Sequence, residues 1–152
     1  MVSEIDKRLL KYFEEHKEFI CCKAGCSECC EKGDYPISES ELKLLMEGYS
    51  RLDNINKIRV QENIRNMERG GACPFLLDKL CSVYDYRPMI CRIHGLAYLL
   101  NDGRVKVPYC VNSGKNYAKV YSNGEFMAEP IKENLDTLFQ VGEIRNLYDW
   151  LV

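Results

Sequence analysis

The feature that most constrains this chain is a dense run of cysteines. Five of its nine cysteines fall within ten residues. The run reads Cys21-Cys22-Lys-Ala-Gly-Cys26-Ser-Glu-Cys29-Cys30, and the remaining four are Cys73, Cys81, Cys91 and Cys110. Thiolates are strong ligands for zinc and for iron, and a closed structural zinc site takes four ligands. Nine thiols are enough for two such sites, so the spacing predicts a metal-bound core.

Composition favours a reducing environment for these thiols. A chain of 152 residues is long enough to fold without crosslinks. The cysteine count is odd, and the first residues lack the apolar core of a signal peptide, so we expect a cytoplasmic protein without disulfides. No apolar run reaches membrane length, and a net charge of -2 gives no nucleic-acid signal. The expected partner is therefore a metal ion, with no membrane or nucleic acid.

Three helices are predicted before the second group of cysteines. Ser3 resembles an N-cap for a helix that continues to about Ile20. Ser38 and Glu41 form an S-x-x-E capping box, and that helix is expected to end near Gly48. Asp53 caps a third helix, for which residues 70–71, both glycine, provide an end.

The second half of the chain predicts a hairpin and a long helix. Residues 96–100 and 104–109 flank an Asn-Asp-Gly turn, which is typical of a β-hairpin. Apolar residues at helical spacing predict a C-terminal helix over about 130–151. We therefore expect an α+β fold: a mostly α-helical single domain over residues 1–152, with a small β-hairpin region. A cysteine metal cluster at about 21–110 would staple it.

The spacing within the cysteine run carries the local chemistry. Cys22 and Cys26 share a face if the first helix continues, and Cys26-x-x-Cys29 has the gap of a metal knuckle. Cys29 and Cys30 are adjacent, and in extended backbone their side chains point to opposite faces. This favours two sites, or one site plus a structural thiol. The later cysteines would complete sites that the first run begins.

Taken together, these segments resemble the YkgJ-like cysteine-cluster family. The resemblance rests on Cys22-x3-Cys26-x2-Cys29-Cys30, on Cys73-Pro74-Phe75-Leu76 and on the segment from Cys81 to Arg92, which contains Arg87-Pro88. It implies a zinc- or iron-chelating domain with eight cysteine ligands. Those ligands would be Cys22, Cys26, Cys29, Cys30, Cys73, Cys81, Cys91 and Cys110.

Five other residues are considered for a role at the site. His94 follows Cys91 at C-x2-H spacing. It could act as a ligand or a proton carrier, but the interpretation we favour is a hydrogen-bonded structural histidine. Arg87 and Arg92 either neutralise a thiolate-rich site or pair with a nearby carboxylate, Asp85 or Asp78. His16 is expected to be a solvated helix residue. Cys21 is expected to stay outside the ligand set.

The leading hypothesis is a metal-binding protein that chelates zinc or iron, with an iron-sulfur cluster as one form of the iron. Common hydrolase, kinase and dinucleotide motifs are missing from the sequence, so no catalytic residue is assigned. One alternative is an iron-sulfur enzyme or an accessory subunit of a modification enzyme, because flagellin lysine methylases contain a similar cluster. Another is a metal carrier or redox sensor, which needs exchangeable thiolates.

Overall fold

The computed structural model describes residues 4–21, 26–138 and 142–152. It shows an α+β fold with short antiparallel strand pairs, as the sequence predicts. The chain divides into two compact units. Unit 1 comprises Met1–Lys23 and Ile93–Leu138, and unit 2 comprises Ala24–Arg92 and Phe139–Val152. The prediction that residues 1–152 behave as one domain stays a prediction.

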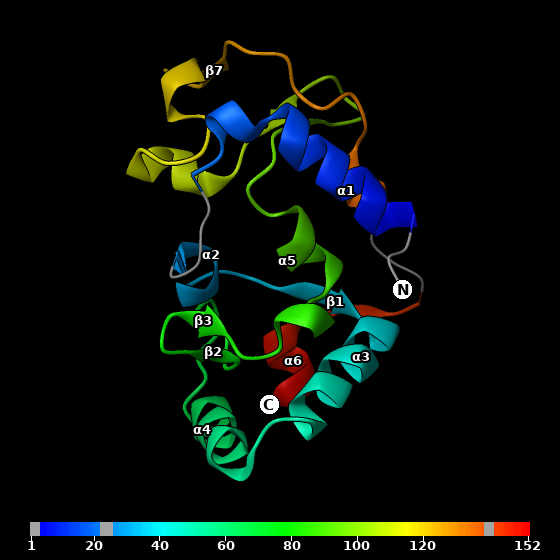
Figure 1. Ribbon diagram of the computed structural model, residues 1–152, viewed down its shortest axis with the longest axis vertical. Helices are drawn as coiled ribbons and strands as arrows, with labels where there is room; N and C mark the ends of the chain where they lie inside the picture. Colours follow the sequence, from blue (N-terminus) through cyan, green and yellow to red (C-terminus); the bar gives the residue numbers. More distant parts are fainter. Residues whose placement is uncertain (1–3, 22–25, 139–141) are drawn as a thin grey trace. The chain divides into compact units, whose positions relative to one another are not determined.

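Unit 1 contains one long helix and two small hairpins (Figure 1). Its elements are α1 (Glu4–Glu15), η1 (Lys17–Phe19), β4 (Tyr98–Leu99), β5 (Val105–Lys106), η3 (Tyr109–Ser113), η4 (Ala118–Val120), β6 (Tyr121–Ser122), β7 (Glu125–Phe126) and η5 (Leu135–Leu138). The β4–β5 pair confirms the predicted hairpin. The first helix ends before Ile20, and Ser3 and Cys22 lie outside the described residues.

Unit 2 contains the two capped helices and most of the cysteines. Its elements are α2 (Glu28–Glu31), β1 (Pro36–Ser38), α3 (Glu39–Ser50), α4 (Asn54–Arg65), β2 (Leu76–Leu77), β3 (Leu80–Cys81), η2 (Tyr84–Tyr86), β8 (Ile144–Asn146) and α6 (Leu147–Leu151). Helix α5 (Met89–Ile93) runs to the boundary with unit 1. The Ser38–Glu41 capping box and the Asp53 cap are both confirmed. Helix α4 ends at Arg65, earlier than the glycine pair at residues 70–71 indicates.

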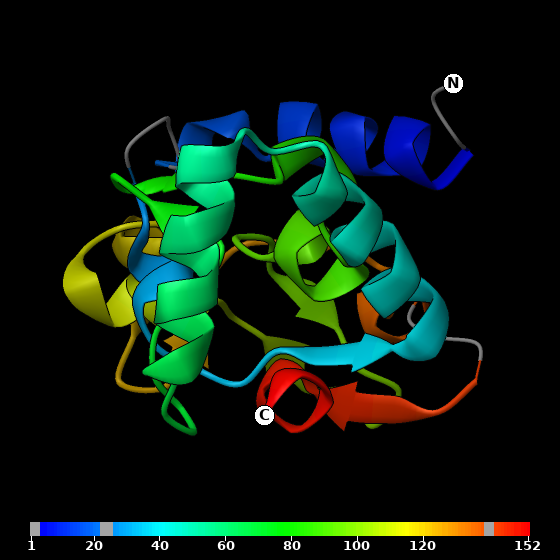
Figure 2. The same ribbon diagram turned by 90° about the horizontal axis from the view of Figure 1, so that it is seen from below.

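The long C-terminal helix predicted over about 130–151 is wrong. Its first part forms only the 3₁₀ turn η5, and Gly142 has φ of +93°, which a right-handed helix does not allow. Strand β8 then pairs antiparallel with β1, and Figure 2 shows the two strands side by side next to α6. The helical spacing of apolar residues corresponds to a helix only in α6, because the residues before it pair with β1 as a strand.

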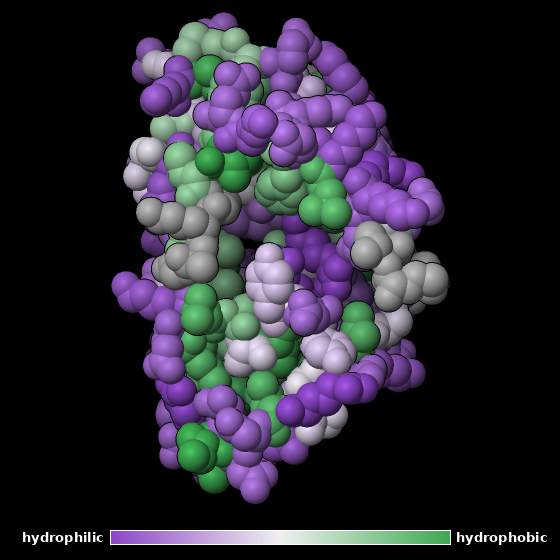
Figure 3. Space-filling view, in the orientation of Figure 1, coloured by the Kyte–Doolittle hydropathy of each residue, from purple (hydrophilic) through white to green (hydrophobic). Residues whose placement is uncertain are grey.

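The core of unit 2 lies between β1, the two capped helices and the β2–β3 hairpin. Its largest fully buried side chains include Phe75, Ile37 and Val60. Trp150 on α6 donates its indole N–H to the carbonyl oxygen of Ile37 at 3.0 Å. Some apolar side chains stay exposed, and hydrophobic residues gather over α4 and the β2–β3 hairpin in Figure 3. Within the described residues, no helix is long and apolar enough to span a membrane.

Gly48 lets α3 approach η2 closely. A Cβ atom at Gly48 would lie 2.7 Å from the ring of Tyr86, which is closer than such atoms pack. Glu41 ties the other end of α3 to α5, because its Oε2 accepts the backbone N–H of Met89 at 2.6 Å. These contacts fix the segment between Cys81 and Cys91 against α3.

We expect Gly48→Ala to destabilise the protein although alanine has the higher helix propensity. The propensity gain is at most about 1 kcal/mol, whereas forcing an extra carbon into a packed contact costs about 1–3 kcal/mol. Urea unfolding should show a net loss. Lys43→Ala, on the exposed face of the same helix, should change the free energy of unfolding by less than about 0.5 kcal/mol. A more stable Gly48→Ala protein would contradict this packing account.

His16 is buried, so the expectation of a solvated residue is wrong. Its Nδ1 lies 2.8 Å from the hydroxyl of Tyr117, which also accepts the N–H of Ala97. Beside it, the fully buried Asn116 accepts the N–H of Cys21 and donates to the carbonyl of Gly95. This polar network lies inside unit 1 and joins α1 to two distant segments. No local sequence pattern marks this network, because His16 and Tyr117 are 101 residues apart.

The buried His16 should make stability fall in acid. Burial lowers the pKa of His16 below the ordinary value of 6.5, against the opposing effect of Glu15 and Glu18. The unfolded chain therefore binds a proton more readily, and the contribution of neutral His16 is lost as pH falls from about 6.5 through the folded pKa. Urea unfolding at pH 7 and pH 5 should show a smaller pH effect in His16→Asn than in the natural protein. Equal pH effects in the two proteins would rule out this role for His16.

Candidate metal centre

Helix α2 places two thiols next to each other. Cys29 and Cys30 occupy consecutive positions of this single turn, and their Sγ atoms are 3.9 Å apart. The prediction that they point to opposite faces is wrong because the backbone here is helical, where successive side chains turn by about 100°. Two sulfurs on one tetrahedral zinc ion at about 2.3 Å lie about 3.8 Å apart. The pair therefore has the spacing of two ligands of one ion.

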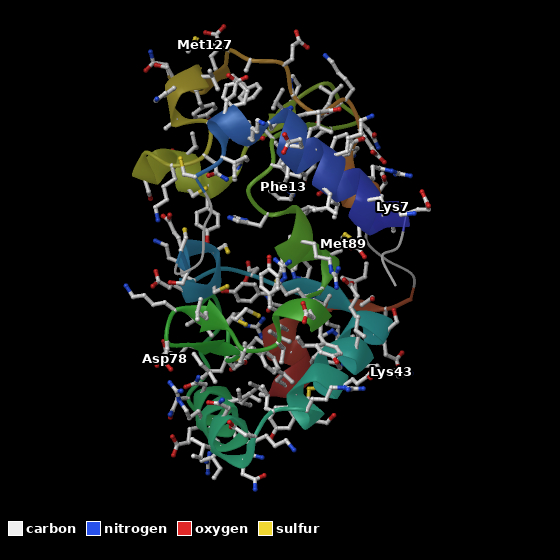
Figure 4. All side chains as sticks on the ribbon, viewed as in Figure 1. Lys7, Phe13, Lys43, Asp78, Met89 and Met127 are labelled. Atoms are coloured by element: carbon white, nitrogen blue, oxygen red, sulfur yellow. The ribbon has the colours of Figure 1, made fainter. Side chains whose placement is uncertain are left out.

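The β2–β3 hairpin brings Cys81 back toward Cys73. Its turn residues Asp78 and Lys79 both have positive φ, as a two-residue hairpin turn requires. Asp78 lies at the tip of the hairpin, where Arg59 binds its carboxylate through two hydrogen bonds of 2.8 and 3.0 Å (Figure 4). The backbone N–H of Cys73 donates to the carbonyl of Cys30 at 2.8 Å. This bond joins the start of the hairpin segment to α2.

Backbone amides point at two of the thiols. The backbone amides of Phe75 and Leu76 lower the pKa of Cys73, and that of Val83 lowers the pKa of Cys81, because each amide favours the charged sulfur. The N–H of Leu76 donates to the carbonyl oxygen of Cys73 at 3.2 Å. Such turns are prepared for a charged sulfur. Nothing in the side-chain pattern marks these amides, so sequence analysis missed them.

Cys91 on α5 completes the group. Burial raises its pKa well above the usual range, and the negative charges that Cys73, Cys81 and Cys29 can carry raise it further. The same mutual effect links Cys73 with Cys81 and Cys29. We call these residues the thiol cluster: Cys29, Cys30, Cys73, Cys81 and Cys91. They lie in unit 2, and Figure 4 shows sulfur atoms beside α2 and the hairpin.

Burial is the main reason that the thiols stay protonated. It raises the pKa of Cys73 to about 12 and also raises that of Cys81. For Cys29 the largest cause is the hydrogen bond with Cys30, followed by burial. Cys29, Cys73, Cys81 and Cys91 are therefore neutral thiols that must lose protons to bind a metal.

The remaining predicted ligands lie elsewhere. Cys26 is half-buried and directly precedes the N-cap of α2, Ser27. Cys110 is buried in η3 of unit 1, at 4% exposure. Cys22 lies outside the described residues. Cys21, which was expected to stay outside the ligand set, is exposed in unit 1.

The cluster gathers thiols without yet arranging them around one point. Within the described ranges, no three Cys, His, Asp or Glu side chains are already placed to hold a common ion. The cysteines that the structure describes are not joined in disulfides. The short elements would have to move for three or four sulfurs to meet one metal. The donor set itself, thiols with amides directed at them, fits zinc or iron.

The fold and the cluster define a class: small α+β proteins that gather cysteines for metal chelation. A family model matches residues 21–121, and its description is "CxxCxxCC: Putative zinc- or iron-chelating domain". The chain belongs to this family, and its function therefore includes metal chelation. Comparisons with curated proteins and with solved structures gave no match.

Metal binding should release protons and strengthen as pH rises. Because burial raises the pKa of Cys73 to about 12, and also raises the values of Cys81 and Cys91, the free thiols are protonated at neutral pH. Each thiol that binds gives its proton to the solvent. Zinc titrations in two buffers of different ionisation enthalpy should report more than one proton released per ion. The Cys21→Ser variant should release the same number, and release below one proton would contradict thiolate ligation.

Proposed function

We propose that this protein binds zinc or iron through the thiol cluster of unit 2, and that the metal mainly organises the fold. The observation that carries the proposal is geometric: the Cys29 and Cys30 sulfurs lie 3.9 Å apart, and a backbone hydrogen bond of 2.8 Å joins Cys73 to Cys30. Scattered structural cysteines would not be brought together in this way. Small apolar residues at these positions would pack as well as the cysteines do, so packing alone does not explain why the thiols are buried together.

The lengths of the elements support a structural role for the metal. Helix α2 has 4 residues, and β2 and β3 have 2 residues each. Elements this short have little stability of their own in water. Structural zinc in small peptides contributes about 10–16 kcal/mol, comparable with the roughly 5–15 kcal/mol of a whole domain. A bound metal would thus fix the segments that present its ligands.

The spacing of Cys29 and Cys30 bears on the kind of centre. Each iron of a four-iron cluster takes one protein thiolate, an iron of a two-iron cluster takes two, and a single zinc or iron ion takes up to four. Two thiols 3.9 Å apart suit a single ion or a two-iron cluster. We therefore favour a single ion held by Cys29 and Cys30 together with two of the three thiols of Cys73, Cys81 and Cys91.

The other ligands and the cellular setting remain part of this proposal. By the resemblance, Cys22, Cys26 and Cys110 complete an eight-cysteine set, which is enough for a second ion. Nine cysteines in one chain are best kept reduced in the cytoplasm, and we propose that location.

The first experiment is metal analysis of protein purified without oxygen. We expect about one or two zinc or iron ions per chain, no stoichiometric sulfide and an unfolding midpoint that falls when a strong chelator removes the metal. Iron with equal acid-labile sulfide would establish an iron-sulfur centre and favour the enzyme or redox alternatives. Protein that contains no metal after purification, and takes up none when reduced and reloaded, would refute the proposal.

Serine substitutions then test the ligands. Cys29→Ser and at least two of Cys73→Ser, Cys81→Ser and Cys91→Ser should lower the metal content, because a hydroxyl is a poor substitute for a thiolate on zinc. Cys21→Ser is the matched control, since its exposed thiol lies in the same run but outside the cluster. Cys110→Ser tests the resemblance separately. Full metal content in all four cluster variants would place the centre elsewhere.

A further inference from the structure

A pocket of about 250 Å³ opens in the surface of unit 2, between the end of α3 and the segment that contains η2. Gly48, Arg51 and Leu52 line it from the side of α3, and residues 81–86 line it from the other side. Sites for drug-sized ligands measure about 300–1,000 Å³. A metal ion with about six water molecules, each of about 30 Å³, occupies about 180 Å³. The pocket therefore has room for a hydrated ion but is small for an organic ligand.

The walls of the pocket are fixed by packing and by backbone hydrogen bonds. The Tyr86 ring lies against α3 where Gly48 has no side chain, so a Cβ atom there would be 2.7 Å from the ring. Val83 is buried, and its carbonyl accepts the backbone N–H of Tyr86 at 2.8 Å. The N–H and the hydroxyl of Ser82 both donate to the carbonyl of Phe75, at 2.9 and 2.7 Å. The pocket is thus held in shape by the protein itself.

Of the five residues of the thiol cluster, Cys81 alone lines this pocket. Backbone contacts connect it to other thiols of the cluster. Cys81 pairs with Leu76 across the β2–β3 hairpin, and the N–H of Leu76 donates to the carbonyl of Cys73 at 3.2 Å. The N–H of Cys73 donates in turn to the carbonyl of Cys30, whose Sγ lies 3.9 Å from that of Cys29. The pocket therefore reaches the cluster at Cys81.

The polar groups of the lining favour a cation. Asp85 is exposed, and among the residues that the structure describes its carboxylate has no hydrogen-bond or ion-pair partner. The positive charge of Arg51 is offset by Glu47, whose Oε1 lies 3.2 Å from the guanidinium. Carboxylate oxygens bind hydrated divalent ions, whereas thiols hold zinc and iron more firmly. An exposed carboxylate and a half-buried thiol thus lie along one pocket, the weaker ligand nearer the solvent.

We propose that this pocket is the route by which a divalent metal ion enters and leaves the thiol cluster, with Asp85 at its mouth and Cys81 as the first thiol on the way. The inference rests on the proposed function of the same site. The Cys81 thiol gives its proton to the solvent when its sulfur takes the place of a water molecule on the ion. A route shared by entry and exit changes both rates by the same factor. It therefore sets how fast the metal exchanges without changing the equilibrium affinity.

Cobalt(II) is the probe for this proposal, because its thiolate complexes absorb visible light. Loading of the reduced full-length protein is followed by stopped-flow absorption, and release by transfer of cobalt(II) to excess EDTA. Leu52→Trp places a larger side chain in the pocket wall and should slow both loading and release about threefold or more, with unchanged affinity. Leu52→Ala widens the pocket at the same position, so neither rate should fall. Natural rates in folded Leu52→Trp, or equal slowing in Leu52→Ala, would overturn the inference.

A second pair of variants tests the mouth of the pocket and does not depend on whether Leu52→Trp folds. Asp85→Asn removes the carboxylate that attracts the ion, so loading should slow about two- to fivefold at low ionic strength and less in high salt, which screens the charge. Glu62→Gln is the matched control, because Glu62 is an exposed carboxylate of unit 2 outside the pocket. Its loading should match that of the natural protein. Equal loading rates in Asp85→Asn and Glu62→Gln would overturn the inference.

The same measurements distinguish the two proposals. If the natural protein gives no thiolate bands with cobalt(II), the proposed function fails, and the route fails with it. If the bands form in the natural protein and the pocket variants load and release cobalt(II) at the natural rates, the route alone is lost.

Discussion

The burial of thiols that must ionise is the constraint on which unit 2 depends. Burial raises the pKa of the Cys73 and Cys91 thiols above the ordinary value, so both are held more firmly in the neutral form. Amides of Phe75, Leu76 and Val83 act in the opposite direction, and Arg87 adds to their effect. Unit 2 therefore keeps these thiols neutral among groups that favour their charged forms. Without a metal, this arrangement avoids the large cost of buried charge.

Unit 1 is organised by a different kind of interior. Asn116 is fully buried and links the backbone of Cys21 to that of Gly95. Next to it, Tyr117 has a positive φ of 65°, which a bulky residue adopts only when its surroundings impose it. The hydrogen bonds of its hydroxyl with Ala97 and His16 provide that compensation. In unit 1, buried polar groups join separate segments of the chain, which is the role proposed for a metal in unit 2.

Sequence reasoning succeeded where structure is local. The Ser38–Glu41 box, the Asp53 cap and the hairpin around residues 101–103 were predictable because short-range hydrogen bonds and turns decide them. The prediction of a long C-terminal helix failed because a distant pairing decides the structure there. The residues of β8 pair with β1 and form a strand although their apolar residues have helical spacing. The gathering of Cys29, Cys73, Cys81 and Cys91 was predicted as a discontinuous ligand set. Its electrostatic detail was not, because the amides and the position of Arg87 leave no pattern in the sequence.

The pairing of β1 with β8 has a further consequence. The family match ends at residue 121, whereas β8 and α6 lie at 144–151. A segment of the family's length keeps every thiol of the cluster, yet it lacks the strand that pairs with β1 and the Trp150 hydrogen bond to Ile37. The part of the chain that defines the family is thus smaller than the part that completes the core. The cysteines shared with the family and the residues that complete the core of unit 2 therefore span different ranges of the chain. A residue beyond position 121 can affect the thiol cluster through its contacts with that core.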